Sequence, residues 1–168
     1  AVTPSIDRMM HAWLGRLTMG LSPASLNEAF MDWAAHLAMS PGKQAQLLEK
    51  AARKWLRFMV YASKCAQGEH PEGGCILPLP QDNRFRAAEW HRPPFNFIHQ
   101  AFLLHQQWWH NATTDVRGVS RHHEEVVAFA ARQLLDIASP SNFIWTNPEV
   151  LHLTLEQGGA NLLRGWNN

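Results

Sequence analysis

Residues 94–168 read PFNFIHQAFLLHQQWWHNATTDVRGVSRHHEEVVAFAARQLLDIASPSNFIWTNPEVLHLTLEQGGANLLRGWNN, and this stretch decides the fold that the sequence predicts. Apolar residues recur at intervals of three and four on both sides of SPSNF, residues 139–143. Proline interrupts a helix at that pentapeptide, because it lacks the N–H that a helix interior requires. TNPE at residues 146–149 then places asparagine before proline, which is typical of a helix start. Two helical segments are therefore expected to meet at a hinge.

The rest of the chain also predicts helices. Apolar periodicity indicates one helix over residues 5–19, a second from the Ser22-Pro23 cap to the break at residues 40–42, and a third over residues 41–65. Further helices are expected over residues 95–111 and 121–138 and from residue 148, with Gly158-Gly159 kinking or dividing the last one. Residues 67–93 are rich in proline and glycine and read as a linker, with a short helical turn near residues 87–90. The expectation is an all-α bundle of about six helices in two groups, residues 1–66 and 94–168, forming one compact domain.

Apolar stripes predict which faces of these helices are buried. In the second helix the stripe is Leu26, Phe30, Trp33 and Leu37. The helix over residues 121–138 is expected to turn five apolar side chains to the core: Val126, Phe129, Ala130, Leu134 and Ile137. In the third helix, Leu48, Ala52, Trp55 and Met59 line one face, and the cations Lys43, Lys50, Lys54, Arg57 and Lys64 fall near the opposite one. That cationic face is either a basic ridge for phosphate, such as coenzyme A, or a solvated face with snorkelling lysines.

One predicted helix carries a cluster of aromatic residues. The cluster consists of Phe95, Phe97, Phe102, Trp108 and Trp109. Because this helix is apolar on more than one face, it is expected to be buried centrally or shared with a partner. Two interpretations stay open, an ordinary core or a surface for a catalytic domain, a second subunit or an apolar polymer. Trp108 and Trp109 are not expected both to be fully buried.

Several short motifs together resemble the N-terminal region of polyhydroxyalkanoate synthases, also called poly-3-hydroxybutyrate polymerases. SPSNF, TNPE and Gly158-Gly159 followed by Asn161-Leu162 resemble that family most strongly. Upstream motifs resemble the same family in the same order. They are Arg84-Phe85 with Trp90 shortly after, and PFNF at residues 94–97 followed by residues 103–109. Residues 6–42 are similar to the short helical segment that precedes this region in many such synthases.

The resemblance implies a function that this stretch does not perform alone. These synthases are acyltransferases that join 3-hydroxyacyl groups from acyl-coenzyme A thioesters into polyester, through a cysteine in a G-x-C-x-G box on an α/β-hydrolase domain. No such box occurs in the 168 residues. The chain also starts at Ala without Met and stops without a clear cap, so an N-terminal domain without its catalytic domain is expected. By resemblance it supports activity, homodimer formation and attachment to cytoplasmic polyester granules or their coat proteins.

The composition limits the classes of protein to which the chain can belong. The chain has 46% apolar residues, with eight Trp and eight Phe against one Tyr, which is ample material for a core or an interaction surface. A net charge of +1 does not demand a nucleic-acid partner. No apolar run has transmembrane length and no signal peptide is evident, so a cytoplasmic protein is expected. Two cysteines do not form a disulfide framework, although a single bridge between Cys65 and Cys75 stays possible.

No catalytic, cofactor or metal site is predicted. His99, His105 and His110 are spaced by six and five residues, which places their rings on different helix faces. The run HHEE at residues 122–125 reads as helix N-terminal charge rather than an acid–base pair. Neither Cys65, at a helix C-terminus, nor Cys75 has the setting of an activated thiol. Two alternatives remain, a stand-alone granule or lipid-surface binding module, and a thiol acyltransferase whose turnover would be lost when Cys65 or Cys75 becomes Ala.

Overall fold

A computed structural model describes residues 3–17, 20, 22–69, 71 and 73–166 of the chain. Within these residues the chain is all-α and contains no strand, which confirms the predicted fold class. The helices are α1 (Thr3–Leu17), α2 (Pro23–Ala38), α3 (Pro41–Ala66), α4 (Phe95–Thr113), α5 (Arg121–Ile137), α6 (Pro148–Glu156) and α7 (Ala160–Trp166). Two short 3-10 turns, η1 (Ala88–His91) and η2 (Pro140–Asn142), lie in the connections.

The helix boundaries follow the local sequence signals. Ser120 Oγ accepts a hydrogen bond from the backbone N–H of His123 at 3.2 Å, which caps α5. Asn147 Oδ1 accepts from the backbone N–H groups of Glu149 and Val150 at 3.0 and 3.3 Å, which caps α6. Gly158 and Gly159 take φ values of +54° and +86°, and they separate α6 from α7, so the predicted division of the last helical segment is confirmed. The helical turn predicted near residues 87–90 is confirmed as η1.

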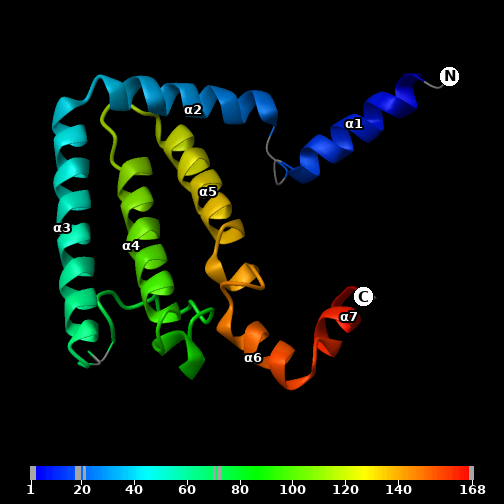
Figure 1. The fold of residues 1–168 in the computed structure, drawn as a ribbon. Helices are drawn as coiled ribbons and strands as arrows, with labels where there is room; N and C mark the ends of the chain where they lie inside the picture. The colour runs from blue at the N-terminus through cyan, green and yellow to red at the C-terminus, as the bar shows by residue number, and fades with distance from the viewer. Residues whose placement is uncertain (1–2, 18–19, 21, 70, 72, 167–168) are drawn as a thin grey trace.

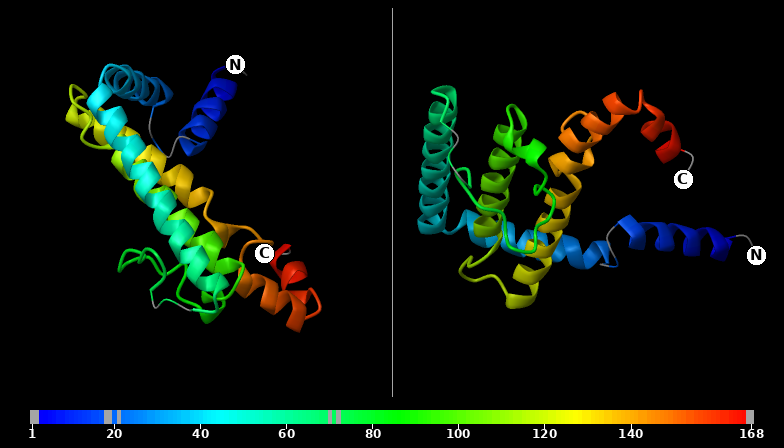
Figure 2. Two further views of the ribbon diagram at one scale, coloured as in Figure 1. Left: turned by 60° about the vertical axis from the view of Figure 1, so that its left-hand side comes forward. Right: turned by 90° about the horizontal axis from the view of Figure 1, so that it is seen from below.

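Helix α4 is the centre of the arrangement. It packs against α3 on one side and α5 on the other, and α2 packs against one end of both α3 and α5 (Figures 1 and 2). Helix α1 projects away from this layer, and α6 and α7 continue from the opposite end of α5 (Figure 1). Because α2 packs on α5 and α3 on α4, the two groups of helices that the linker separates in sequence are interleaved in space.

Two small clusters form the core. In the first, Trp33 of α2 lies among apolar residues of α5 and the α4–α5 connection, and its Nε1 donates to the backbone oxygen of Ala112 at 2.9 Å. In the second, the linker residue Phe85 and Trp90 of η1 pack against Phe102 and Leu103 of α4. The linker is therefore part of the core at its C-terminal end, as the sequence predicts for Arg84-Phe85 and Trp90.

Two predicted stripes are only partly buried. Leu26, Trp33 and Leu37 of α2 reach the first core cluster, whereas Phe30 is 50% exposed. On α5, Val126 and Val127 are buried, but Phe129, Leu134 and Ile137 are exposed, so their predicted place in the core is wrong. The reason is that α2, α4 and the linker residue Arg84 contact other parts of α5, and these three side chains lie outside those contacts.

Over the residues that the structure describes, no helix is both long enough and apolar enough to cross a bilayer.

Candidate interaction surfaces

The aromatic cluster of α4 is packed within the chain. Phe102 is buried and Phe95, Phe97, Trp108 and Trp109 are half-buried, so the expectation for the two tryptophans is confirmed. The ring of Phe97 meets the rings of Phe58 and Tyr61 of α3 edge-on, with centroids 6.5 and 6.0 Å apart. Trp108 Nε1 donates to the backbone oxygen of Leu47 at 3.0 Å, and Trp109 packs on the first core cluster. A role for the cluster in binding a partner stays a prediction.

Helix α3 faces the opposite way from the direction that its amphipathic pattern suggests. Leu48, Trp55 and Met59 are 72, 63 and 48% exposed, and their neighbours Leu56 and Val60 are also exposed. These five residues, with the small residues between them, form what we call the outer face of α3. An apolar face of this size in water normally marks a surface that another element covers.

The lysines of α3 instead turn toward α4. Lys50 Nζ donates to the side-chain oxygen of Asn111, and Lys54 Nζ donates to that of Gln107. Lys43 Nζ donates to the backbone oxygen of Thr114 at 2.8 Å. Burial lowers the pKa of Lys43 and of Lys54. These three lysines form the polar part of the α3–α4 contact. The predictions of a basic ridge and of a solvated face are therefore both wrong for them. Arg57 and Lys64 remain exposed.

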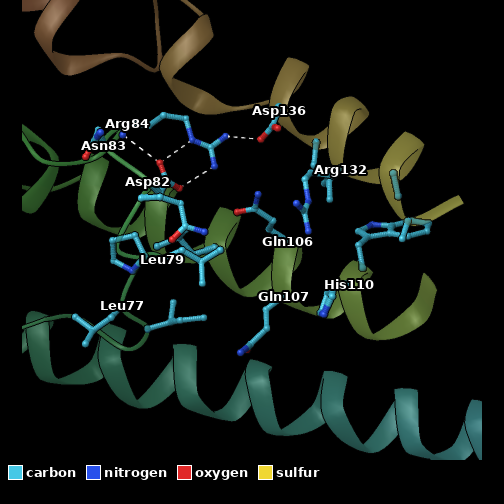
Figure 3. A pocket seen from close by; sticks show the side chains of 18 of the residues that line it. Leu77, Leu79, Asp82, Asn83, Arg84, Gln106, Gln107, His110, Arg132 and Asp136 are labelled. Carbon is cyan, nitrogen blue, oxygen red and sulfur yellow. Dashed lines mark hydrogen bonds and ion pairs between the residues drawn. The ribbon is translucent and has the colours of Figure 1, made fainter. Parts of the chain in front are cut away.

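A groove of about 890 Å³ lies between the linker, α4 and α5 (Figure 3). Its walls are mainly apolar and include Leu77 and Leu79 of the linker and Leu103 of α4. Its polar side chains come from all three elements: Asp82, Asn83, Arg84, Gln106, Gln107, His110, Arg132 and Asp136. No sequence motif indicated this groove.

Arg84 joins the linker to α5 at one end of this groove. Its Nε and Nη2 donate to the two carboxylate oxygens of Asp82 at 2.9 and 2.8 Å, and Nη1 donates to Asp136 at 2.9 Å (Figure 3). The hydrogen bonds from Arg84 lower the pKa of Asp82, and those to Asp82 raise the pKa of Arg84. The guanidinium also lies 5.3 Å from the ring centre of Phe102. This network neutralises both carboxylates of the groove and fixes the linker.

Gln100 of α4 holds the middle of the linker. Its Oε1 accepts from the backbone N–H groups of Cys75 and Ile76 at 2.7 and 2.8 Å, and its Nε2 donates to the backbone oxygen of Ile76 at 3.0 Å. The same Nε2 lies 2.9 Å from Nε2 of His99. Gly74 has φ +68°, and a Cβ there would lie 2.5 Å from the Gln100 side chain. Glycine is therefore required for this close approach.

His99 is held in its neutral form. Its Nδ1 bonds to the backbone oxygen of Phe95 at 3.1 Å, so Nδ1 carries the proton and Nε2 accepts from Gln100. Burial lowers the pKa of His99. A second proton on Nε2 would also face the N–H of Gln100.

The lowered pKa of His99 predicts a pH-dependent stability. Below about pH 6.5 the unfolded chain takes up a proton at this residue that the folded chain resists. The contribution of neutral His99 to the stability of the fold is therefore complete above pH 6.5. It is lost as the pH falls from there toward the pKa of His99 in the folded chain. We expect the urea midpoint to decrease more between pH 7.5 and 5.5 in the parent chain than in His99→Gln. Equal decreases in both chains would contradict the assignment.

Two residues of the HHEE run, His123 and Glu124, have partners within the chain. His123 Nδ1 lies 2.6 Å from Asp32 Oδ2, and this contact joins α5 to α2. Within α2, His36 Nδ1 lies 3.0 Å from Asp32 Oδ1. Hydrogen bonding to His123 is the main cause that lowers the pKa of Asp32. Glu124 accepts from the backbone N–H of Asp115 at 2.7 Å. The described residues contain no group of three side chains that would hold a metal ion.

The two cysteines are free thiols. Cys65 Sγ lies 3.7 Å from Nδ2 of Asn96, and both cysteines are half-buried. Burial raises the pKa of Cys75, which is the opposite of what a nucleophilic thiolate requires. Of the two interpretations, free thiols are confirmed.

A second exposed apolar region follows the end of α5. Trp145, Leu155, Leu163 and Trp166 are 72, 83, 71 and 90% exposed. The region is attached to the core through Trp90, whose Nε1 donates to Oε1 of Glu149 at 3.0 Å. We call residues 143–166 the C-terminal apolar region.

Known proteins resemble the chain over most of its length. Residues 81–168 match the family described as poly-beta-hydroxybutyrate polymerase (PhaC) N-terminus, and residues 1–43 match that described as poly-beta-hydroxybutyrate polymerase N terminal. A poly(3-hydroxyalkanoate) polymerase of Methylorubrum extorquens is 45% identical over 126 residues, which cover 74% of this chain and 21% of that protein.

Two further relatives are polymerase subunits. The poly(3-hydroxyalkanoate) polymerase subunit PhaC of Rhizobium etli is 30% identical over 73% of this chain and 19% of its own length. The subunit of the same name from Cupriavidus necator is 30% identical over 82% of this chain and 22% of its own length. The chain thus spans about a fifth of the length of these relatives. No solved structure matches it.

Proposed function

The chain belongs to the poly-beta-hydroxybutyrate polymerase family, whose N-terminal region it represents, and we propose that it is a non-catalytic helical domain that supports an acyltransferase. In this proposal the parent protein polymerises 3-hydroxyacyl groups from coenzyme A thioesters, and the nucleophile lies in a separate catalytic domain. The helical domain covers apolar surface of that catalytic domain and steadies the active dimer.

The C-terminal apolar region is the observation that carries the proposal. It leaves Trp145, Leu155 and Trp166 almost fully in water, although the same residues could be buried against a neighbour. Burying apolar surface yields about 25 cal/mol per Å², so a partner that covers these side chains gains substantial binding free energy. Aromatic side chains are enriched at such interfaces. A catalytic domain of the same parent is the partner that the family relationship supports.

Reconstitution in two parts tests this function. The 168-residue chain is mixed with the separately produced catalytic domain of its parent polymerase, and coenzyme A release is followed. We expect a faster rate or a shorter lag, and we expect Trp145→Lys with Leu155→Lys to abolish the gain. Met39→Lys is the control, since Met39 is 71% exposed at the far end of α2. No rate effect together with no complex on size-exclusion chromatography would refute the proposal.

The aromatic cluster of α4 is a second surface that we propose for the same partner. Trp108 and Trp109 are half-buried and keep part of each ring at the surface. If the exposed parts contact the catalytic domain, Trp108→Ala with Trp109→Ala weakens association while the circular dichroism of the chain is retained. Loss of helicity in this variant would assign the two rings to the core alone.

A granule or lipid-surface binding module is the alternative function, and α1 is the observation that favours it. This helix projects from the layer and exposes Ile6, Met9, Met10 and Trp13, with Arg8 and Arg16 on the same helix (Figure 1). Such amphipathic helices bind apolar surfaces that carry few charges. Cosedimentation with polyester particles that survives high salt would support a hydrophobic attachment of the cytoplasmic protein to granules. Binding lost in high salt would be electrostatic.

A further inference from the structure

The groove between the linker, α4 and α5 has room for a small apolar molecule. Ala128 and Ala131 line it from α5, and such short side chains leave space that larger residues would occupy. Leu103 and Trp109 of α4 and the linker residues 76–79 complete its apolar wall. The volume of about 890 Å³ lies within the range of small-molecule sites, which is roughly 300–1,000 Å³.

Two polar side chains of this groove have no polar partner among the described residues. Arg132 of α5 makes no ion pair or hydrogen bond there, and the side-chain amide of Gln106 on α4 makes no hydrogen bond. Figure 3 shows both side chains entering the space between α4 and α5. Because they come from facing helices, one group of a ligand can accept hydrogen bonds from both.

These donors and the charges around them fit a single carboxylate. The guanidinium of Arg132 presents a planar fork that matches two carboxylate oxygens, and the Gln106 amide can donate to one of them. At one end of the groove, Asp82 and Asp136 share the single cation Arg84. That excess of negative charge disfavours a phosphate, which carries a charge of about −1.5 to −2 at neutral pH. A ligand with one negative charge is therefore favoured.

The linker wall indicates what the rest of the ligand is. Leu77, Pro78 and Leu79 offer apolar side chains in succession, and none of them has a side-chain hydrogen-bond donor or acceptor. An alkyl chain gains from such a wall, because each buried CH₂ group strengthens binding by about fourfold. A chain with ester oxygens at short intervals gains less, because these oxygens lose water without receiving a donor.

We propose that this groove binds the anion of a free medium-chain fatty acid. The carboxylate lies between Arg132 and Gln106, and the alkyl chain lies along the linker residues 77–79. The site is separate from the exposed surfaces proposed for the catalytic domain and for granules.

Isothermal titration calorimetry of the 168-residue chain with sodium octanoate, below its micellar concentration, tests the site. We expect one saturable site with a dissociation constant below about 1 mM at neutral pH. Hexanoate should bind about 10-fold more weakly, because it lacks two CH₂ groups. Octan-1-ol has the same chain without the charge, and it should bind at least about 10-fold more weakly than octanoate.

Variants locate the two parts of the ligand. Arg132→Gln should weaken octanoate binding at least about 10-fold and leave octan-1-ol binding unchanged. Arg117→Gln is the matched control, because Arg117 is also an exposed arginine but lies outside the groove, and it should bind octanoate as the parent chain does. Ala131→Phe fills the groove and should weaken the binding of both molecules. Circular dichroism should show unchanged helicity in Arg132→Gln, because Arg132 is exposed.

Several results would overturn the inference. They are the absence of octanoate binding, equal binding of octanoate and octan-1-ol, and equal effects of Arg132→Gln and Arg117→Gln. Tighter binding of octyl phosphate would identify a phosphate site instead. Tighter binding of a 3-hydroxybutyrate tetramer with a free carboxylate would assign the groove to the end of a polyester chain. A chain that binds none of these molecules but accelerates coenzyme A release with the catalytic domain would refute this site and leave the proposed function standing.

Discussion

Replacing Trp90 by alanine is expected to lower the free energy of unfolding by about 3–5 kcal/mol, the largest effect of any single substitution considered for this chain. Trp90 is completely buried, and its ring packs edge-on against Phe85 with centroids 4.9 Å apart. Its Nε1 also donates to Glu149, so one side chain joins η1, α4 and α6. Its loss leaves a cavity in the second core cluster and detaches α6.

Thermal unfolding followed by circular dichroism measures this effect. For a domain of this size, about 3–5 kcal/mol corresponds to a decrease in Tm of about 10 °C. Trp145→Ala is the matched control, because Trp145 is 72% exposed, and we expect a change within about 0.5 kcal/mol. Trp90→Phe keeps most of the ring volume and should recover more than half of the loss. Equal effects at Trp90 and Trp145 would contradict the position of η1 in the core.

Replacing Gln100 by leucine is expected to cost about 2–4 kcal/mol, although the two side chains have similar sizes. The change leaves the N–H groups of Cys75 and Ile76 and the backbone oxygen of Ile76 without their partner. It also removes the donor to His99. Unsatisfied polar groups in a low-dielectric site cost about 1–3 kcal/mol each, and the linker can lower this cost only by leaving α4.

Hydrogen exchange distinguishes this outcome from general destabilisation. In Gln100→Leu, the amides of Cys75 and Ile76 should exchange faster than those of α2 and α5, because the linker opens before the helices do. Gln106→Leu is the matched control, since Gln106 lies on the same helix and its side chain makes no hydrogen bond with the described residues. If the free energy of unfolding fell equally in the two variants, the hydrogen bonds of Gln100 to the linker would not stabilise the fold.

Local signals in the sequence are sufficient to place most of the helices. Ser120 and Asn147 cap α5 and α6 as predicted, because capping depends only on groups within one turn of each other. The same holds for the glycine pair that ends α6. By contrast, the hydrogen bond from the Cys75 N–H to the Gln100 side chain joins residues 25 positions apart, and no local pattern indicates it. The Arg84–Asp136 ion pair and the groove beside it were missed for the same reason.

Local sequence patterns also do not show how far the aromatic cluster of α4 is buried. The aromatic residues of α4 are recognisable as a cluster from sequence, but their half-burial depends on Leu47, Phe58 and Tyr61 of α3. The sequence did not indicate that Trp145 and Trp166 are exposed, since an apolar residue in a sequence looks the same whether another element covers it or not.

The sequence by itself determined the all-α class, most of the helix ends and the family, and it left open whether α4 is buried centrally or shared with a partner. Only the tertiary structure decided which face of each helix is buried. Periodicity determines how side chains are arranged around one helix, but burial depends on which side chains and backbone groups the neighbouring helix presents to it. Asn111, Gln107 and the Thr114 carbonyl beside α4 accept the hydrogen bonds of three lysines, so α3 packs through its cationic side. Its apolar residues Leu48, Trp55 and Met59 stay exposed in the part of the chain that the structure describes.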